Sequence, residues 1–224
     1  MNIEKICEVI NTGGLVITPT DTIYGIMADA INEDAVRSVY DVKKRGYNKP
    51  LIVLMDSFEM VEEYTEELSE MEKKLMHKFW PGLVTFILKK NDKISDLITS
   101  GNDTVGVRIP DNNDLLEIIR RLKRPVVSTS ANITETPVIT CIEMLEDDIV
   151  NSVDYIEDGG LIENESSTII KVNEKDIKIL REGKEFKVHM IRKEGVTYVK
   201  TRDIAEVTGY QISNQGKTPV LVKE

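Results

Sequence analysis

The chain has 224 residues, which is enough for one large domain or for one domain with an appendage. Its hydrophobic fraction of 41% fits a globular protein, and no apolar run approaches a membrane span. The net charge of −10 argues against a protein that coats nucleic acid, because such a protein needs Lys and Arg over a whole face.

The charge is unevenly distributed along the chain. Residues 56–72 and 143–165 hold eight and nine acidic side chains and no basic one, whereas residues 184–224 hold eight basic and five acidic side chains. The acidic segments are typical of solvated surface. No basic region with an apolar core opens the chain, so we expect no secretory signal. Cys7 and Cys141 lack metal-ligand spacing. We expect both to be packing residues of a cytoplasmic protein.

Helical patterns and short apolar runs alternate from the N-terminus. Apolar residues at helical spacing predict a helix over residues 3–10, and a buried strand follows at residues 15–17. Asn32 is the expected N-cap of a second helix, which ends in a basic cluster. Residues 51–54 then form another buried strand.

The second half of the chain continues the alternation. Ser69 and Glu72 predict a capping box at the start of a helix, and a further apolar helix face covers residues 115–122. The pattern predicts an α/β domain with a mixed, twisted sheet and flanking helices. The remaining predicted strands are residues 84–88, 105–108, 125–128, 153–156, 167–172 and 177–180.

Residues 184–224 differ from this body in charge and pattern. We interpret them as an appendage of unknown role, after a body of residues 1–183. Within the appendage, residues 203–210 resemble one helix and turn of a helix-turn-helix. A single such helix is weak evidence for nucleic-acid binding.

Polar side chains follow several predicted strands, where an α/β sheet usually binds its ligand. Residues 128–132 read Ser-Thr-Ser-Ala-Asn and offer hydroxyl and amide groups in a small space. Residues 20–25 carry further hydroxyls after the strand at 15–17. Each segment alone could be a simple turn. Together they indicate a binding site for a ligand with phosphates or a carboxylate.

Cations lie close to the same strands. Three cations follow the second helix: Lys43, Arg45 and Lys49. They could be a solvated helix end. They could also be a phosphate site, which is favoured because Lys49 leads directly into a buried strand. Arg108 ends an apolar strand, where it could form a structural ion pair or bind an anion. Arg181 ends the last strand of the body. No Walker A loop, zinc spacing or Gly-x-Ser-x-Gly elbow is present.

The ordered set of motifs resembles the YrdC/Sua5 family of L-threonylcarbamoyladenylate synthases. Each motif is short, but eight in the right order over residues 1–183 are specific together. The matching segments are Pro19-Thr20-Asp21-Thr22-Ile23-Tyr24-Gly25, Lys43-Lys44-Arg45, Lys49-Pro50-Leu51, Trp80-Pro81-Gly82-Leu83-Val84-Thr85, Val107-Arg108-Ile109-Pro110, Ser128-Thr129-Ser130-Ala131-Asn132, Ser167-Thr168-Ile169-Ile170 and Leu180-Arg181-Glu182-Gly183.

The resemblance implies an enzyme that makes threonylcarbamoyl-AMP and pyrophosphate from L-threonine, bicarbonate and ATP, with Mg²⁺ on the ATP phosphates. Its product would feed the t6A modification of adenosine 37 in tRNAs that read ANN codons, through a downstream t6A transferase complex. The implied fold is a twisted sheet with a deep basic cavity. Weak tRNA binding would fit such a cavity, and no membrane is implied.

The resemblance also implies roles for individual residues. Threonine would be placed by Thr20, Arg108, Ser130 and Ser167, and ATP by Lys43, Arg45, Lys49, Ser128, Asn132 and Arg181. The first three cations of the ATP set would also be the catalytic residues, because this chemistry needs positioning and positive charge more than a strong base.

Two departures from the family pattern bear on these expectations. Longer members carry a second domain, which residues 184–224 are too short to form. Those members also have a His where this chain has Leu54, so threonine would be contacted differently. Two alternative functions are a non-enzymatic tRNA-binding module and an enzyme that forms carbamoyl-AMP, as in hydrogenase-maturation proteins with a similar domain.

Overall fold

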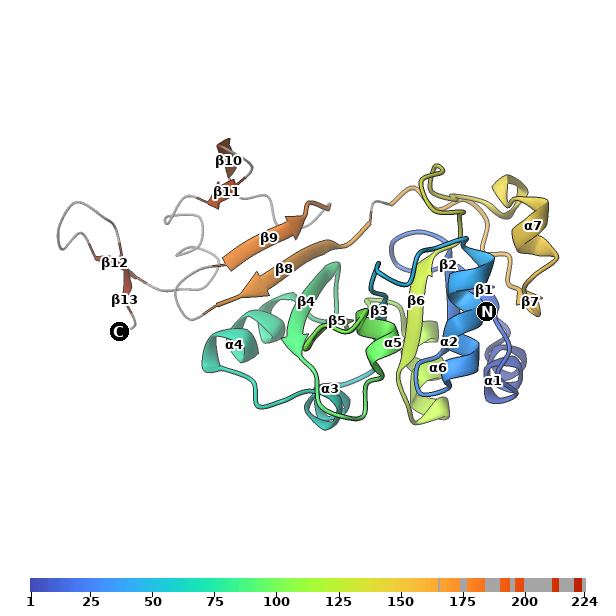
Figure 1. The fold of residues 1–224 in the computed structure, drawn as a ribbon, viewed down its shortest axis with the longest axis horizontal. Coiled ribbons are helices and arrows are strands. Elements are labelled where there is room, and N and C mark those ends of the chain that lie inside the picture. The colour runs from blue at the N-terminus through green and yellow to red at the C-terminus, as the bar shows by residue number, and fades with distance from the viewer. Residues whose placement is uncertain are drawn as a thin grey trace.

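The architecture comes from a computed structural model, which describes residues 1–164, 166–173, 177–183, 190–193, 196–199, 211–213 and 220–222. Nine strands of the body form one mixed sheet in the order β7-β1-β2-β6-β3-β5-β4-β8-β9, so the predicted fold class is confirmed. Figure 1 shows this sheet extending from β7 and β1 near the N-terminus to β8 and β9. The strands are β1 (Val16–Thr18), β2 (Gly25–Asp29), β3 (Ile52–Leu54), β4 (Val84–Lys89), β5 (Thr104–Arg108), β6 (Val126–Ser130), β7 (Tyr155–Ile156), β8 (Thr168–Val172) and β9 (Ile177–Arg181).

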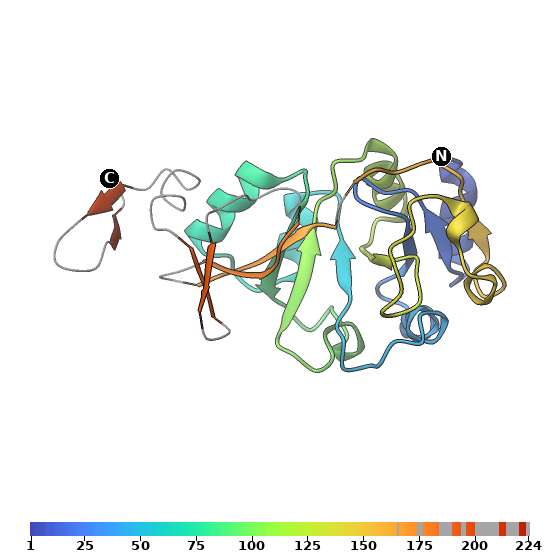
Figure 2. The same cartoon turned by 90° about the horizontal axis from the view of Figure 1, so that it is seen from above.

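Parallel and antiparallel pairs alternate across the centre of the sheet. Strand β3 runs parallel to β5 and antiparallel to β6, and Figure 2 shows β3 in cyan beside β5 in green. Strand β4 pairs antiparallel with β5 and parallel with β8. This pairing brings the hydroxyl-rich end of β6 and the cation-bearing end of β5 onto the same sheet, although they are far apart in sequence.

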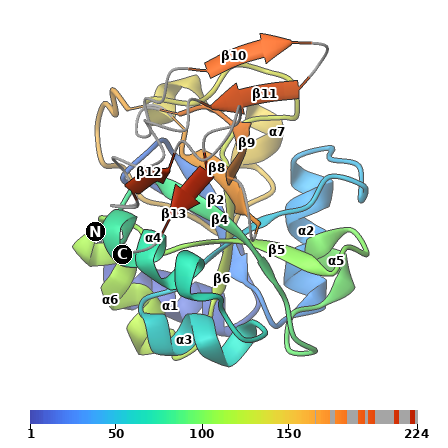
Figure 3. The same cartoon turned by 90° about the vertical axis from the view of Figure 1, so that its left-hand side faces the viewer.

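Helices cover both faces of the sheet. Helices α1 and α6 contact each other and cover Val16, Met27 and Val126 on one face. The alternate residues of the same strands, such as Ile17 and Val127, point to the opposite face and pack in the cluster that contains α2. Figure 3 shows α2 and α5 on one side of β6 and α1 and α6 on the other. The helices are α1 (Ile3–Asn11), α2 (Glu33–Val42), α3 (Phe58–Tyr64), α4 (Glu70–Phe79), α5 (Asp96–Thr99), α6 (Asn113–Leu122), the 3₁₀ helix η1 (Ile142–Met144) and α7 (Asp147–Val150).

Local sequence signals start these helices as predicted. The Asn32 side chain accepts hydrogen bonds from the backbone N–H groups of Asp34 and Ala35 at the start of α2. Ser69 and Glu72 form the expected capping box of α4. None of the helices in the described residues has the length and apolar character that a bilayer crossing requires.

Only parts of the C-terminal segment are described. Four short strands form two separate antiparallel pairs: β10 (Met190–Lys193) with β11 (Val196–Val199), and β12 (Gln211–Ser213) with β13 (Val220–Val222). Residues 203–210, which resemble part of a helix-turn-helix, lie outside the described residues.

Removal of the α2 cap provides a test of this local analysis. Asn32→Ala leaves two N–H groups of the first turn without their acceptor, so the free energy of unfolding should fall by about 1 kcal/mol. Asn32→Asp keeps an acceptor oxygen and should stay close to the wild type. Urea denaturation of the three proteins measures the difference, and equal loss in both variants would contradict the capping role.

Candidate active site

A cavity of about 540 Å³ lies on the face of the sheet that α1 and α6 cover in part. Ile52 and Leu54 line this cavity and also contact the α1–α6 cluster, so the cavity begins where the helices end. Side chains from β6, β3, β5, β4, β8 and β9 and from the turn before β2 form its floor and walls. The open part of the sheet face is therefore the place where a ligand can contact side chains from six strands.

The lining of the cavity is strongly cationic for so acidic a chain. No carboxylate lines it within the described part of the chain, whereas hydroxyl groups come from the segments around β2, β6 and β8. Such a lining suits an anionic ligand with several hydrogen-bonding groups. The five cationic residues are Arg45, Arg108, Lys171, Lys178 and Arg181.

The hydroxyl side of the cavity comes from β6 and the turn before β2. Ser128 and Ser130 lie on the same face of β6, and Ser130 pairs with Gly25 of β2. A Cβ atom on Gly25 would lie 3.0 Å from Ser128 Oγ, so glycine leaves room for this hydroxyl. The Thr20 hydroxyl closes a tight turn by accepting the N–H of Thr22 at 3.0 Å.

Lys43 lies behind this wall rather than in the cavity. Its ammonium group donates hydrogen bonds to the backbone oxygens of Ser130 and Asn132, and its side chain is buried. The Asn132 side chain belongs to the same cluster, since its Oδ1 accepts from the Ser130 hydroxyl. Lys43 therefore fixes the segment that follows β6. Burial, with a smaller effect of the Arg45 charge, lowers the pKa of Lys43 to about 7.

Arg45 reaches the cavity from the loop after α2. Its guanidinium donates to the backbone oxygens of Lys49 at 3.0 Å and of Pro50 at 2.8 Å. Burial lowers the pKa of Arg45. The Lys49 ammonium instead forms an exposed ion pair with Glu135 at 3.2 Å, outside the cavity lining. Of the three predicted site cations in this stretch, Arg45 alone lines the cavity.

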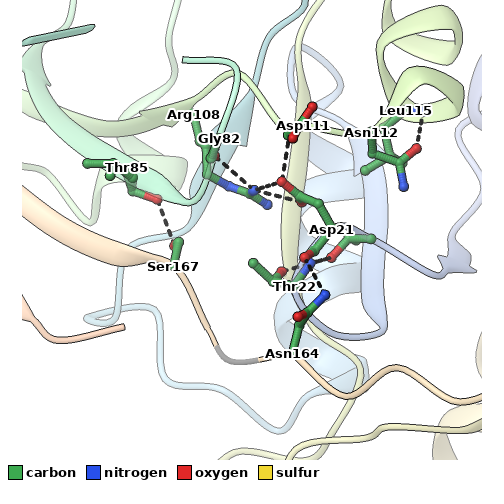
Figure 4. A network of polar contacts seen from close by, with 12 residues as sticks. Asp21, Thr22, Gly82, Thr85, Arg108, Asp111, Asn112, Leu115, Asn164 and Ser167 are labelled. Carbon is green, nitrogen blue, oxygen red and sulfur yellow. Dashed lines mark hydrogen bonds and ion pairs between the residues drawn. The ribbon is translucent and has the colours of Figure 1, made fainter. Parts of the chain in front are cut away.

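Arg108 forms a buried ion pair, which Figure 4 shows from close by. Both carboxylate oxygens of Asp21 accept from Arg108 Nη1, at 2.7 and 2.6 Å, and the two side chains are 6% and 5% exposed. Asp21 also accepts the backbone N–H of Asp111 at 2.9 Å. The Gly82 carbonyl lies 3.4 Å from the same Nη1 atom. Since the contacts of Arg108 with Asp21 and Gly82 all use Nη1, Asp21 orients the guanidinium without covering its other nitrogens.

Ser167 and Arg181 form the cavity wall opposite the hydroxyl side at β6. The Arg181 guanidinium donates to the Ser167 backbone oxygen at 3.0 and 2.9 Å and to the Ser167 hydroxyl at 3.0 Å. The same hydroxyl lies 2.8 Å from the Thr85 hydroxyl of β4. Burial and, second, the charge of Arg108 lower the pKa of Arg181. A Cβ atom on Gly183 would overlap the backbone around Ser166, so glycine permits this close approach.

The structure thus brings most of the predicted site residues to one cavity. Lys43 and Asn132 lie behind its wall, and Lys49 lies at the surface. The residues that line it are Thr20, Arg45, Arg108, Ser128, Ser130, Ser167 and Arg181.

Sequence reasoning did not single out Asp21, Thr85, Lys171 or Lys178. Asp21 could have been found as the one acidic residue within the hydroxyl-rich stretch that follows β1. The two lysines carry no local signal, because only the pairing of β8 with β9 places them together. Groups of three or more His, Cys, Asp or Glu side chains suited to a metal are absent from the described residues.

Known proteins are similar in sequence to this body. A family model for Sua5, YciO and YrdC, described as telomere recombination, matches residues 8–183. A putative threonylcarbamoyl-AMP synthase of Methanocaldococcus jannaschii is 40% identical over 178 residues, which are 79% of this chain and 82% of the relative. The threonylcarbamoyl-AMP synthase of Pyrococcus abyssi is 35% identical over 207 residues, or 89% of this chain and 61% of that protein.

Solved structures agree with the sequence relationship. The crystal structure of P. abyssi Sua5 complexed with L-threonine matches with a TM-score of 0.79 and 30% identity. The match covers 99% of this chain and 64% of the P. abyssi chain, so this chain spans less than two thirds of that longer relative. The family model covers most of the chain, and all the residues that line the cavity lie within the matched segment. The chain therefore belongs to the Sua5/YciO/YrdC family.

Proposed function

We propose that this chain is an L-threonylcarbamoyl-AMP synthase. The observation that carries the proposal is the cavity itself: three arginines line it beside serine and threonine hydroxyls, and only Arg108 has a described carboxylate partner. The names of the relatives give the same reaction. Because both ATP and threonine bring negative charge, a cavity with uncompensated cations supplies what their encounter requires.

The reaction needs two bond-forming steps. The threonine amine adds to bicarbonate with loss of water and gives a carbamate. An oxygen of this carbamate attacks the α-phosphorus of ATP, and the bond from that phosphorus to the bridging oxygen breaks as pyrophosphate leaves. Both reactants are anions, so catalysis depends on holding them in line and on stabilising the departing charge.

The geometry suggests how the two substrates share the cavity. The threonine carboxylate would meet the nitrogens of Arg108 that Asp21 leaves uncovered, near the hydroxyls of Thr20, Ser130 and Ser167. ATP would contact the remaining lining residues of the predicted set, which are Arg45, Ser128 and Arg181.

Lys43, Lys49 and Asn132 would act on ATP only indirectly. Lys43 and Asn132 hold the backbone that presents Ser130, and the Lys49 carbonyl accepts from Arg45. The proposed catalytic contribution of Lys43 and Lys49 is therefore to position cavity residues.

Magnesium would enter as part of its complex with ATP. The described lining offers hydroxyl oxygens and cations and no carboxylate, so it fits a nucleotide whose own phosphates carry the ion. When bound, Mg²⁺ would neutralise part of the phosphate charge.

The product would serve tRNA modification in the cytoplasm. We propose that threonylcarbamoyl-AMP passes to a t6A transferase complex that modifies adenosine 37 of tRNAs reading ANN codons. The mixed anhydride of such a product hydrolyses in water, so rapid transfer to the next enzyme would preserve it. Any tRNA contact by this chain would be weak, because its net charge is −10.

Pyrophosphate release tests the proposed reaction directly. The purified protein, given ATP, Mg²⁺ and bicarbonate, should release pyrophosphate only when L-threonine is present. Replacing L-threonine with L-valine removes the hydroxyl at nearly constant shape and should lower the rate strongly. Release that ignores threonine, or none from a folded protein, would contradict the synthase assignment.

Arg45→Ala should lower this rate at least roughly 100-fold, because it removes a cation that faces the phosphates. Its guanidinium is only half-buried and bonds to two exposed carbonyls, so the fold should persist. Arg37→Ala, on the exposed face of α2, removes the same charge outside the cavity and serves as the control. Full activity of Arg45→Ala would rule out its phosphate role.

Asp21→Asn tests how Arg108 is held. The variant keeps the shape of the side chain but removes the charge that fixes Nη1, so the KM for threonine should rise roughly tenfold. The KM for ATP should change little. Asp111→Asn is the control, because only the backbone N–H of Asp111 contacts Asp21. Equal rises in both KM values would instead indicate a general structural role.

Lys43 should make stability depend on pH. Its pKa of about 7 in the folded protein lies below its ordinary 10.5, so between these values the unfolded chain holds a proton that the folded chain has lost. The free energy of unfolding of the wild type should therefore increase, relative to Lys43→Met, as pH rises from 7 to 9.

Urea denaturation at several pH values measures the difference between the two proteins. Below pH 6 both states carry the proton and the difference should level off. Lys5→Met, at an exposed lysine of α1, should show no such trend. A pH-independent difference between the wild type and Lys43→Met would show that the buried amine keeps its ordinary pKa.

A further inference from the structure

Thr85 of β4 is a fully buried polar residue beside the cavity. Ile87, two residues further along the strand, lines the cavity, and residues two apart on a strand share a face. Thr85 is therefore on the cavity side of the sheet, although its side chain is fully buried and does not line the cavity. Its hydroxyl can act on a ligand only through a neighbouring residue.

That neighbour is Ser167. The Thr85 hydroxyl has one hydrogen-bond partner among the described residues, the Ser167 hydroxyl at 2.8 Å, as Figure 4 shows. Ser167 lies just before β8, which pairs in parallel with β4. It lines the cavity and is only 4% exposed. Because each hydroxyl has one hydrogen to donate, the contact can run in either of two directions.

The surroundings of the two hydroxyls determine which one donates. If Ser167 donated to Thr85, the hydrogen of the Thr85 hydroxyl would be buried without an acceptor in the described part of the chain, which is unfavourable. We therefore assign Thr85 as the donor and Ser167 Oγ as the acceptor. Arg181 Nη2 also donates to Ser167 Oγ at 3.0 Å, since a guanidinium has no acceptor.

This assignment leaves the hydrogen of the Ser167 hydroxyl for a ligand. Ser167 Oγ receives two hydrogen bonds, and its own hydrogen has no further partner among the described residues. The two bonds that the oxygen receives polarise its O–H group and strengthen the bond that it can donate. Ser167 therefore presents a hydrogen-bond donor to the cavity, and a group that can only donate would not fit there.

The charges around Ser167 indicate which ligand group accepts this bond. Arg181 contacts Ser167 directly, and Arg108 lies close enough for its charge to lower the pKa of Arg181. An O–H donor beside two guanidinium groups suits an anionic oxygen and disfavours an ammonium group. The carboxylate is the group of L-threonine with that chemistry.

We propose that Thr85 is a positioning residue, which fixes the Ser167 hydroxyl as a hydrogen-bond donor to the carboxylate of threonine. The identity of the ligand rests on the proposed synthase function. Thr85 contacts no substrate itself; it occupies one acceptor position of Ser167 Oγ, as Arg181 occupies another. The threonine amine, where the carbamate forms, would then lie away from the guanidinium groups of Arg108 and Arg181.

Removal of the Thr85 hydroxyl tests this role. Thr85→Val keeps the shape of the side chain but removes the donor, so the KM for threonine should rise roughly fivefold while the KM for ATP stays unchanged. Thr85→Ser restores a hydroxyl and should return the KM for threonine to the wild-type value. Thr65→Val is the matched control, because Thr65 is also buried and its hydroxyl also has one described partner, the Val61 carbonyl at 2.8 Å. A rise in both KM values for Thr85→Val would overturn the positioning role.

A double-mutant cycle tests whether Thr85 acts through Ser167. Calorimetry with L-threonine should show that Thr85→Val binds more weakly than the wild type. In a Ser167→Ala background the same change should have no further effect, because the hydroxyl that Thr85 holds is already gone. Equal losses of affinity in the two backgrounds would overturn the proposal, since they would mean that Thr85 acts independently of Ser167.

The binding results separate this inference from the proposed function. Unchanged threonine affinity in Thr85→Val, or no threonine binding by the wild type, would overturn the positioning role even if pyrophosphate release requires threonine. A wild type that binds threonine through the Thr85–Ser167 pair but releases no pyrophosphate from ATP would support the positioning role and contradict the synthase function.

Discussion

Backbone carbonyl oxygens hold two of the three arginines that line the cavity, and the chemistry of the cavity depends on this choice of partner. A carboxylate partner would cancel the charge of a guanidinium, whereas a carbonyl dipole orients it and leaves the charge available to a ligand. Arg108 is the exception, since Asp21 holds it at one nitrogen. The two cavity arginines with carbonyl partners are Arg45 and Arg181, and Lys43 behind the cavity wall is held in the same way.

Uncompensated charge is unfavourable for the folded state, so the rest of the fold must offset it. Burial already lowers the pKa of Lys43, Arg45 and Arg181. The opposite face of the sheet carries a large apolar cluster, and α1 and α6 cover much of the cavity face. The site is thus a charged, open part of one sheet face, and the remaining surface of the sheet is packed against apolar side chains. Binding of an anion would relieve the repulsion and add to stability.

Sequence reasoning succeeded where the signal was local. The caps of α2 and α4 and most strands follow from short patterns, but β2 was missed because Gly25 begins it and Asp29 ends it. Asp29 is buried through an ion pair with Arg124 at 2.6 Å, which no local pattern reveals. The site residues that face inward, such as Lys43, or that pair across strands, such as Lys171, likewise depend on contacts between distant segments.

The order of strands in the sheet has a consequence for how the protein folds while it is synthesised on the ribosome. The walls of the cavity come from residues 20–25 at one end of the body and from residues 166–171 and 178–181 at the other. The parallel pairing of β4 with β8 closes the cavity, and it spans more than 80 residues of sequence, from Val84 to Thr168. A nascent chain that has emerged only as far as β6 lacks an entire wall. A ligand of the cavity could therefore promote folding only after β9 has left the exit tunnel, when its binding would favour the completed domain over partly folded states.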